Sequence, residues 1–139
     1  MDVRARGRLM AEIAAQKTVG GEIAVPLDLF FTGNDDPGSI GCNLGPQQPA
    51  IRDFYAAFSS LRERPEVQDI WVRIYDADDE NCWPFSDTVY VISSLSQAEI
   101  KAALSSLKFD EVSSGWMYGK PVSAPVPKSG FKPYSVWWD

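Results

Sequence analysis

The chain has 139 residues, of which 45% are hydrophobic, and it carries 13 basic against 19 acidic side chains for a formal net charge of −6. This length suits one domain with a substantial core, and the negative mean field disfavours nucleic acid and anionic membranes while it favours a basic partner protein. The chain contains no histidine, which excludes Ser-His-Asp and Cys-His catalytic sites.

The first residues predict a helix that stands apart from the rest. Residues 4–17 have an amphipathic pattern that Gly20 and Gly21 end, and three arginines make this segment basic. We therefore interpret residues 1–21 as an N-terminal extension that is loosely docked or disordered, and residues 22–139 as a single domain. Residues 22–31 alternate as a half-buried strand, in which Pro26 favours an edge position or a break. Residues 27–31 fit a short helical turn as an alternative.

The middle of the chain predicts a helix and a hairpin. Residues 39–44 suggest a short strand, and Pro49 then suits the first residue of a helix that Pro65 ends. Its apolar side chains recur at helical spacing: Ile51, Phe54, Tyr55, Phe58 and Leu61. Apolar and polar side chains alternate again over residues 67–76, which predicts a strand. The acidic residues 76–83 indicate the loop that joins it to an antiparallel strand.

The clearest unit is a strand, turn and helix within residues 85–107. Residues 87–93 are apolar on both faces, which predicts the centre of a sheet. Ser96 and Glu99 then have the spacing of a capping box at the start of a helix. Residues 110–118 predict a further strand, residues 120–133 a loop, and residues 134–138 a buried closing strand.

These elements predict an α+β fold with a mainly antiparallel sheet and two helices packed on one face. Their order matches the ferredoxin-like, split βαβ order with an extra C-terminal strand. That fold places the first strand in the centre, where Pro26 is unfavourable, so another antiparallel α+β topology is the alternative.

No cofactor or metal motif is present. Asp76, Asp78 and Glu80 have the one-three-five spacing of a calcium loop, but Asn81 replaces the glycine at position six and Asp87 the final glutamate. A solvated hairpin loop is the better interpretation, and we expect no metal site. The glycines match neither a phosphate-binding loop nor a dinucleotide fingerprint, so we expect no cofactor. No apolar run approaches the ~20 residues of a membrane span.

An acidic surface with aromatic anchors is the best candidate site. Aromatic side chains near the acidic loop would supply affinity for a basic protein, and the carboxylates would supply association rate. Alternatively, the outer face of the strand at residues 67–76 packs under the second helix or the C-terminal strand. The candidate residues are Asp35, Asp36, Trp71, Tyr75, Asp76, Asp78, Asp79, Glu80 and Trp83.

Four segments, GNDDPGSIGCNL, VQDIWVRIYD, WPFSDTVYVI and VWWD, resemble those of small, mostly uncharacterised bacterial proteins. In size, acidity and α+β make-up these are similar to immunity-type proteins that neutralise toxins. The resemblance implies a stoichiometric binder of a basic partner and supplies no catalytic residue. We therefore expect a non-catalytic, cytoplasmic protein-binding module; two cysteines fit a reducing compartment. The alternatives are a small carboxylate- or metal-dependent enzyme using the acidic loops, and a structural accessory protein without a ligand.

Overall fold

The computed structural model describes all 139 residues and contains one five-stranded sheet in which every pair of neighbours is antiparallel. The α+β prediction is therefore confirmed. In spatial order the strands are β1 (Ala24–Pro26), β2 (Val67–Arg73), β3 (Thr88–Ser93), β5 (Lys132–Trp137) and β4 (Glu111–Ser114). Strand β3 is central and buried along its whole length, as its two apolar faces predicted.

A row of valines crosses the whole sheet on one face. Val25, Val72, Val89, Val136 and Val112 lie opposite one another from strand to strand, and each is fully buried. β-Branched side chains pack well on a pleated surface and against cross-strand neighbours. A shift of register by one residue in any strand would move its valine to the other face, so this row fixes the register.

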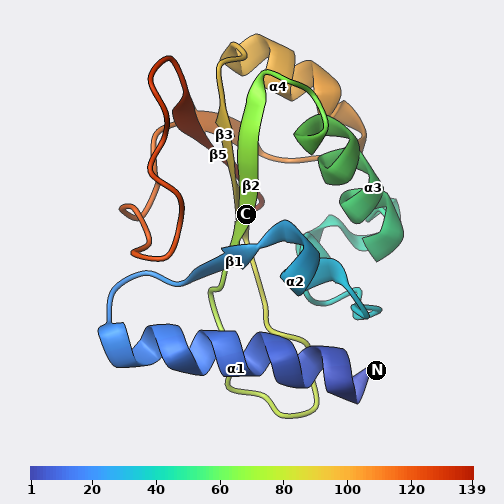
Figure 1. The fold of residues 1–139 in the computed structure, drawn as a ribbon. Helices are drawn as coiled ribbons and strands as arrows, with labels where there is room; N and C mark the ends of the chain where they lie inside the picture. The colour runs from blue at the N-terminus through green and yellow to red at the C-terminus, as the bar shows by residue number, and fades with distance from the viewer.

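Helices cover the valine face (Figure 1). Helix α3 (Ile51–Arg62) presents Phe54 and Phe58 to the core, and both rings meet the buried indole of Trp138 edge-on. Helix α4 (Gln97–Ala103) begins with the predicted capping box: the Ser96 hydroxyl accepts a hydrogen bond from Glu99 N, and Ser96 N donates to the Glu99 carboxylate, each at 3.1 Å. Two short 3₁₀ helices, Cys42–Gln47 and Ser105–Leu107, complete this side.

The opposite face is covered by a long connection, residues 115–131, which we call the strap (Figure 1). The Trp116 ring meets the fully buried Tyr90 edge-on at 4.9 Å between ring centroids, and Ser135 binds Met117 N and Gly115 O through its hydroxyl. The sequence alternatives for this face were the second helix or the C-terminal strand. The strap covers it because its aromatic residues pack over Tyr90 and Arg73.

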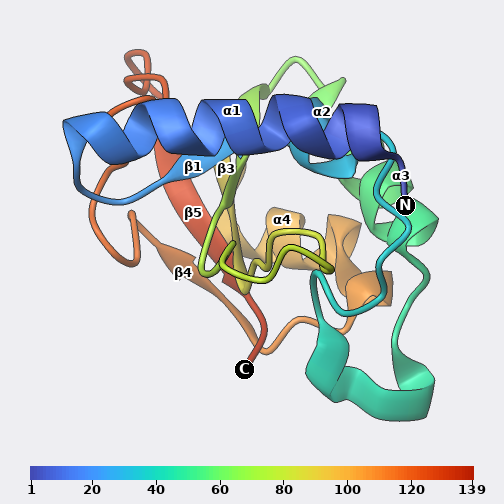
Figure 2. The same ribbon diagram turned by 90° about the horizontal axis from the view of Figure 1, so that it is seen from below.

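The N-terminal segment corrects the expectation of a loosely docked or disordered extension. Helix α1 (Val3–Val19) buries Ala5, Leu9 and Ile13 in the core, and Figures 1 and 2 show it lying across the edge of the sheet next to the hairpin loop. The buried Gln16 amide donates to Ala24 O at 2.8 Å. The helix approaches Gly33 (φ +76°) so closely that a Cβ there would lie 2.7 Å from the Ala5 methyl group.

The structure also decides three predictions about residues 22–44 and the order of the strands. Residues 22–31 form β1 and then helix α2 (Leu27–Phe31), so the helical alternative for residues 27–31 is the right one. Strand β1 lies at the sheet edge, as Pro26 indicated, and not at the centre as the ferredoxin-like order requires. Residues 39–44 contribute a single bridge, Ile40 to Ser86, before the 3₁₀ turn that begins at Cys42.

Candidate functional site

The two acidic loops meet in one hollow. A cavity of about 240 Å³ is lined by Asp36 from the first loop and by Asp76, Asp78 and Asp79 from the second, with Trp83 and Phe85 as apolar wall. We call this the acidic hollow. The loops are joined directly, because the backbone N–H of Trp83 donates to the Asp36 carboxylate at 3.0 Å.

The first loop is a tight turn that the sequence Asp36-Pro37-Gly38 specifies. The Asp36 side chain accepts a hydrogen bond from Gly38 N at 2.8 Å, and Ser39 N donates to Asp36 O at 3.0 Å. The buried Asn34 side chain accepts from Asp36 N at 2.9 Å and donates to the Ser39 hydroxyl at 3.0 Å. Side chains of Asn and Asp that bind the backbone two residues ahead are typical of such turns.

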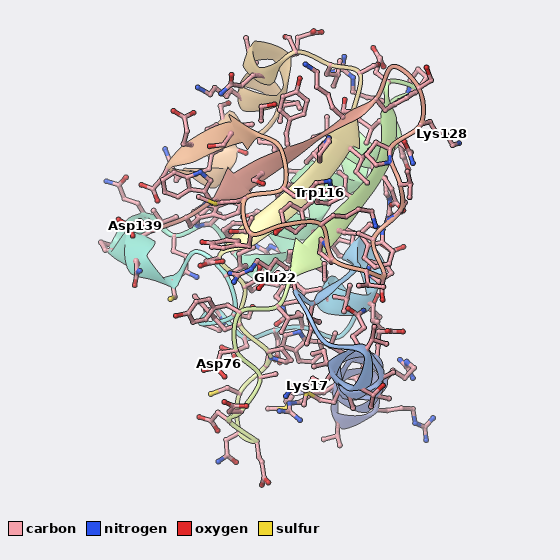
Figure 3. The ribbon with its side chains drawn as sticks, turned by 90° about the vertical axis from the view of Figure 1, so that its left-hand side faces the viewer. Lys17, Glu22, Asp76, Trp116, Lys128 and Asp139 are labelled. Carbon is pink, nitrogen blue, oxygen red and sulfur yellow. The ribbon has the colours of Figure 1, made fainter.

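The second loop is the hairpin connection between β2 and β3, and it projects beside α1 (Figure 3, where Asp76 is labelled). Asp76 accepts from Asp78 N and Asp79 accepts from Asn81 N, both at 2.9 Å. The Arg6 guanidinium of α1 donates to the carbonyls of Cys82 and Asp79 at 3.0 and 3.1 Å. Helix α1 therefore holds the hairpin in place.

The charge of the acidic hollow is only partly offset within the chain, by the Arg6 guanidinium near Asp79. None of the ion pairs of the structure includes one of its four aspartates, since Arg6 binds backbone carbonyls. Hydrogen bonds from Asn81 N and from the Cys82 thiol hold the pKa of the Asp79 carboxyl below its usual value. The same Asp79 contact raises the pKa of the thiol, which makes Cys82 a poorer nucleophile. The acidic residues do not form a cluster of three or more positioned to hold a metal ion.

A second cavity lies on the other side of Phe85. It measures about 340 Å³ and is lined by residues that include Tyr75, Phe85, Asp87, Met117, Tyr118 and Trp137. We call it the aromatic cavity. It brings together the hairpin base, the strap and the end of β5, which are far apart in the sequence. Of its lining, the sequence prediction named only Tyr75, and the closing aromatic residues were the only other signal.

Behind this cavity, Arg73 is almost completely buried. Its guanidinium contacts the carboxylates of Glu22 at 2.7 Å and Asp87 at 3.0 Å, and it lies 3.6 Å from the centroid of the Tyr118 ring. Burial opposes the positive charge, but the two carboxylates outweigh it and hold the pKa of Arg73 above its usual value. The cluster carries a net charge of about −1, because two carboxylates face one guanidinium.

Comparison with known proteins assigns a family. The model of the family described as "Uncharacterized protein YfbO family" matches residues 4–136. The chain belongs to the YfbO family. It is 36% identical over 117 residues to the protein described as "Uncharacterized protein YfbO" from Escherichia coli K12, and the match covers 81% of this chain and 80% of that protein. The expected resemblance to small, uncharacterised bacterial proteins is confirmed by this family and this relative. No solved structure matches.

Within this YfbO-family chain, the predicted site residues separate into two groups. Asp36, Asp76, Asp78 and Asp79 converge on the acidic hollow. Asp35 lies next to it along the chain with its carboxylate 72% exposed, and Glu80 is exposed at the hairpin tip. The acidic part of the predicted surface is therefore gathered at one end of the molecule.

The three aromatic candidates of the YfbO-family chain have different environments. The prediction of Trp83 as a surface anchor is wrong. Only 2% of Trp83 is exposed and its indole N–H donates to Phe30 O at 2.9 Å, so it is a core residue. Trp71 is half-buried and donates to Asp69 at 2.9 Å. Tyr75 is 62% exposed and meets Phe85 edge-on. None of the helices combines the length and apolar character that a membrane crossing requires.

Proposed function

We propose that this protein is a non-catalytic binding module that docks a basic partner protein on its acidic hollow, in the manner of an immunity-type inhibitor. The observation that carries this proposal is the gathering of four aspartates from two loops without a cationic side chain among their ion-pair partners. A partner that brings a basic side chain to this site would be attracted by these carboxylates and would reduce their mutual repulsion.

The rigidity of the two loops supports the same proposal. Asp36, Asp76 and Asp79 each accept backbone hydrogen bonds within their own turns, and Arg6 fixes the hairpin from the side of α1. A charged surface that is ordered before binding loses little conformational entropy on association. Like charges gathered on one surface also steer an oppositely charged partner and raise its association rate.

Tyr75 is the aromatic anchor that we propose for this surface. It directly precedes Asp76 in the hairpin, its ring is 62% exposed, and it is supported from below by Phe85. A tyrosine ring has few rotatable bonds, so it offers a large contact area with a small loss of entropy. Of the three aromatic anchors expected from the sequence, Trp71, Tyr75 and Trp83, Tyr75 is the one with an exposed ring.

The test begins with affinity capture of partners on the tagged chain in lysate of the native host, at low and at moderate salt. The retained protein is purified, and its affinity is measured for the wild type, for Asp78→Lys and for Glu63→Lys. Asp78 lies in the acidic hollow, and its side chain makes no hydrogen bond within the chain, so its reversal spares the fold. Glu63 is an exposed residue at the end of α3 and changes the net charge by the same amount.

We expect Asp78→Lys to slow association at least tenfold at low salt and Glu63→Lys to change it by less than twofold, with both effects shrinking as salt rises. Equal effects of the two reversals would show that only net charge matters and would contradict docking at the hollow. Recovery of no basic protein at either salt concentration would also contradict the proposal.

A further inference from the structure

The aromatic cavity presents rings and carboxylates together, and no basic side chain lines it. Tyr75, Phe85, Tyr118 and Trp137 supply aromatic surface, and Asp87 and Asp139 are the carboxylates of its wall. One oxygen of Asp87 accepts hydrogen bonds from Arg73 and from the Thr88 hydroxyl, both at 3.0 Å. The structure shows no hydrogen bond to its second oxygen.

The one nearby cation, Arg73, is paired with two carboxylates. Arg73 is not part of the wall, and its guanidinium pairs with Glu22 and Asp87. It also lies 3.6 Å from the centroid of the Tyr118 ring and 5.5 Å from that of Tyr75, so a ligand cation would bind the faces of these rings that Arg73 leaves free. With two carboxylates against one guanidinium, this cluster adds to the negative potential that Asp139 supplies. A cationic ligand is therefore favoured over an anionic one.

The apolar side chains around the cavity are exposed to an unusual degree. Tyr75 is 62% exposed, Tyr118 43% and Met117 41%, and these are three of the eight large apolar side chains that the chain leaves exposed. Single exposed apolar residues are common, but a group around one concave site indicates a ligand surface. The rings lie beside carboxylates, and this is the composition that binds ammonium groups through cation–π attraction.

From this arrangement we propose that the aromatic cavity binds an organic cation through an alkylammonium group. Its volume of about 340 Å³ suits a ligand with few heavy atoms. This is near the lower end of the ~300–1,000 Å³ range of ligand pockets, and it is too small for a nucleotide cofactor. A free quaternary amine and the lysine side chain of a protein share this chemistry. The ring faces bind the cation, and Asp87 supplies the counter-charge.

The experiment titrates the full chain with small probes at constant ionic strength and follows tryptophan fluorescence, since Trp137 and Trp138 line the cavity. Choline represents a free quaternary amine and n-butylammonium a lysine side chain. The uncharged 3,3-dimethyl-1-butanol and 1-butanol are their matched neutral controls. We expect saturable binding of at least one cation in the millimolar range, at least about fivefold tighter than its neutral control. The preferred cation identifies the source of the ammonium group.

Two kinds of variant test the wall. Tyr75→Ala removes an exposed ring and should weaken cation binding about fivefold, whereas Tyr75→Phe keeps the ring and should bind as the wild type does. Asp87→Asn removes the counter-charge and should also weaken binding at least fivefold. Thermal unfolding of each variant establishes that it is folded before it is titrated. Glu63→Gln changes an exposed residue that does not line the cavity, and it is the control that should not change the affinity.

If the neutral probes bound as tightly as the cations, the proposal would be overturned, and the cavity would be a site for uncharged ligands. The proposal would also be overturned if no cation bound saturably. It would be overturned as well if Tyr75→Ala and Asp87→Asn both bound the cations as tightly as the wild type does. Asp78→Lys separates this result from docking of a basic protein at the acidic hollow, because it should leave the affinity of the small probes unchanged. Tyr75→Ala does not separate the two, because Tyr75 is also the proposed anchor of the docking surface. Phe85 is the only wall residue that the two cavities share.

Discussion

Replacement of Arg73 by methionine tests whether the ion cluster under the strap stabilises the fold. Methionine keeps most of the side-chain volume but leaves Glu22 and Asp87 without a cation. Removal of one partner from a buried ion pair costs about 3–5 kcal/mol, because the remaining charge is desolvated and unpaired. The carboxylates here are 34% and 22% exposed and keep part of their hydration. We therefore expect a loss of about 2–3 kcal/mol in the free energy of unfolding.

The loss is measured by urea denaturation followed by tryptophan fluorescence, with thermal unfolding as a second observable. A change of this size lowers the Tm of a chain of this length by about 10 °C. Arg62→Met is the matched control, because Arg62 pairs with the exposed Asp28 at 3.0 Å and its loss should cost less than about 1 kcal/mol. The double variant Arg73→Met/Asp87→Asn should be less destabilised than the sum of its single variants, because it leaves one unpaired carboxylate in place of two.

A loss below about 0.5 kcal/mol for Arg73→Met would refute this reasoning, since it is no more than an ordinary surface substitution costs. Equal losses for the Arg73 and Arg62 variants would refute it too, because burial would then have no influence on the strength of the pair. Strict additivity in the double variant would show that Arg73 and Asp87 act independently, despite their contact.

Three further predictions concern the sheet, the hairpin and acid stability. Burial raises the pKa of Tyr90 to about 12, and its hydroxyl has no hydrogen-bond partner. Tyr90→Phe removes this unsatisfied group and should stabilise the fold by about 1 kcal/mol in urea denaturation. It should also remove the tyrosine that titrates near pH 12 in ultraviolet absorbance. Arg6→Ala removes the two hydrogen bonds to the hairpin and should speed amide exchange at residues 79–82 while exchange in β3 stays unchanged. A uniform increase would instead mean global destabilisation. The hydrogen bond from Arg62 lowers the pKa of Asp28, so the pair stabilises the fold above the ordinary aspartate pKa of 3.8, and this contribution is lost as pH falls through the lowered value. Asp28→Asn should flatten the pH dependence of stability below about pH 4, which acid titration of the Tm measures.

The elements that sequence predicted well are those whose signals are local. The capping box at Ser96 and the apolar stripe of α3 are complete within a few turns of one helix, and β3 shows its central position through apolar side chains on both faces. Local signals of this kind are sufficient because each element carries its own boundary and its own buried face.

The first strand shows where such signals are ambiguous. Leu27 and Phe31 satisfy the alternation of a strand, but with Phe30 they also form one face of a helical turn, and all three are buried. Pro26 then decides the outcome. It ends the strand at the sheet edge and, with its fixed φ, serves as the cap of α2.

The sites required knowledge of long-range contacts. The acidic residues of the hollow were identified from composition, but their convergence depends on the bond from Trp83 N to Asp36, which joins residues 47 positions apart. The docking of α1 depends on Arg6 binding carbonyls more than 70 positions away, so its basic pattern alone suggested an appended segment. The aromatic cavity joins the hairpin base to the strap and β5, which no periodicity connects.

The position of β5 in the sheet bears on how the chain folds. This strand follows the other helices and strands in the sequence, yet it lies between β3 and β4 in the sheet. Strand β4 pairs only with β5, so β5 joins β4 to the rest of the sheet. The β2–β3 hairpin can pair early, but the partners Val89 and Val136 are brought together only by closing a long loop. We expect slow, millisecond-to-second folding that becomes cooperative only once β5 has been synthesised, because sheets built on distant pairings fold slowly. Until then, β3 exposes an unpaired apolar edge, which is a template for aggregation during synthesis.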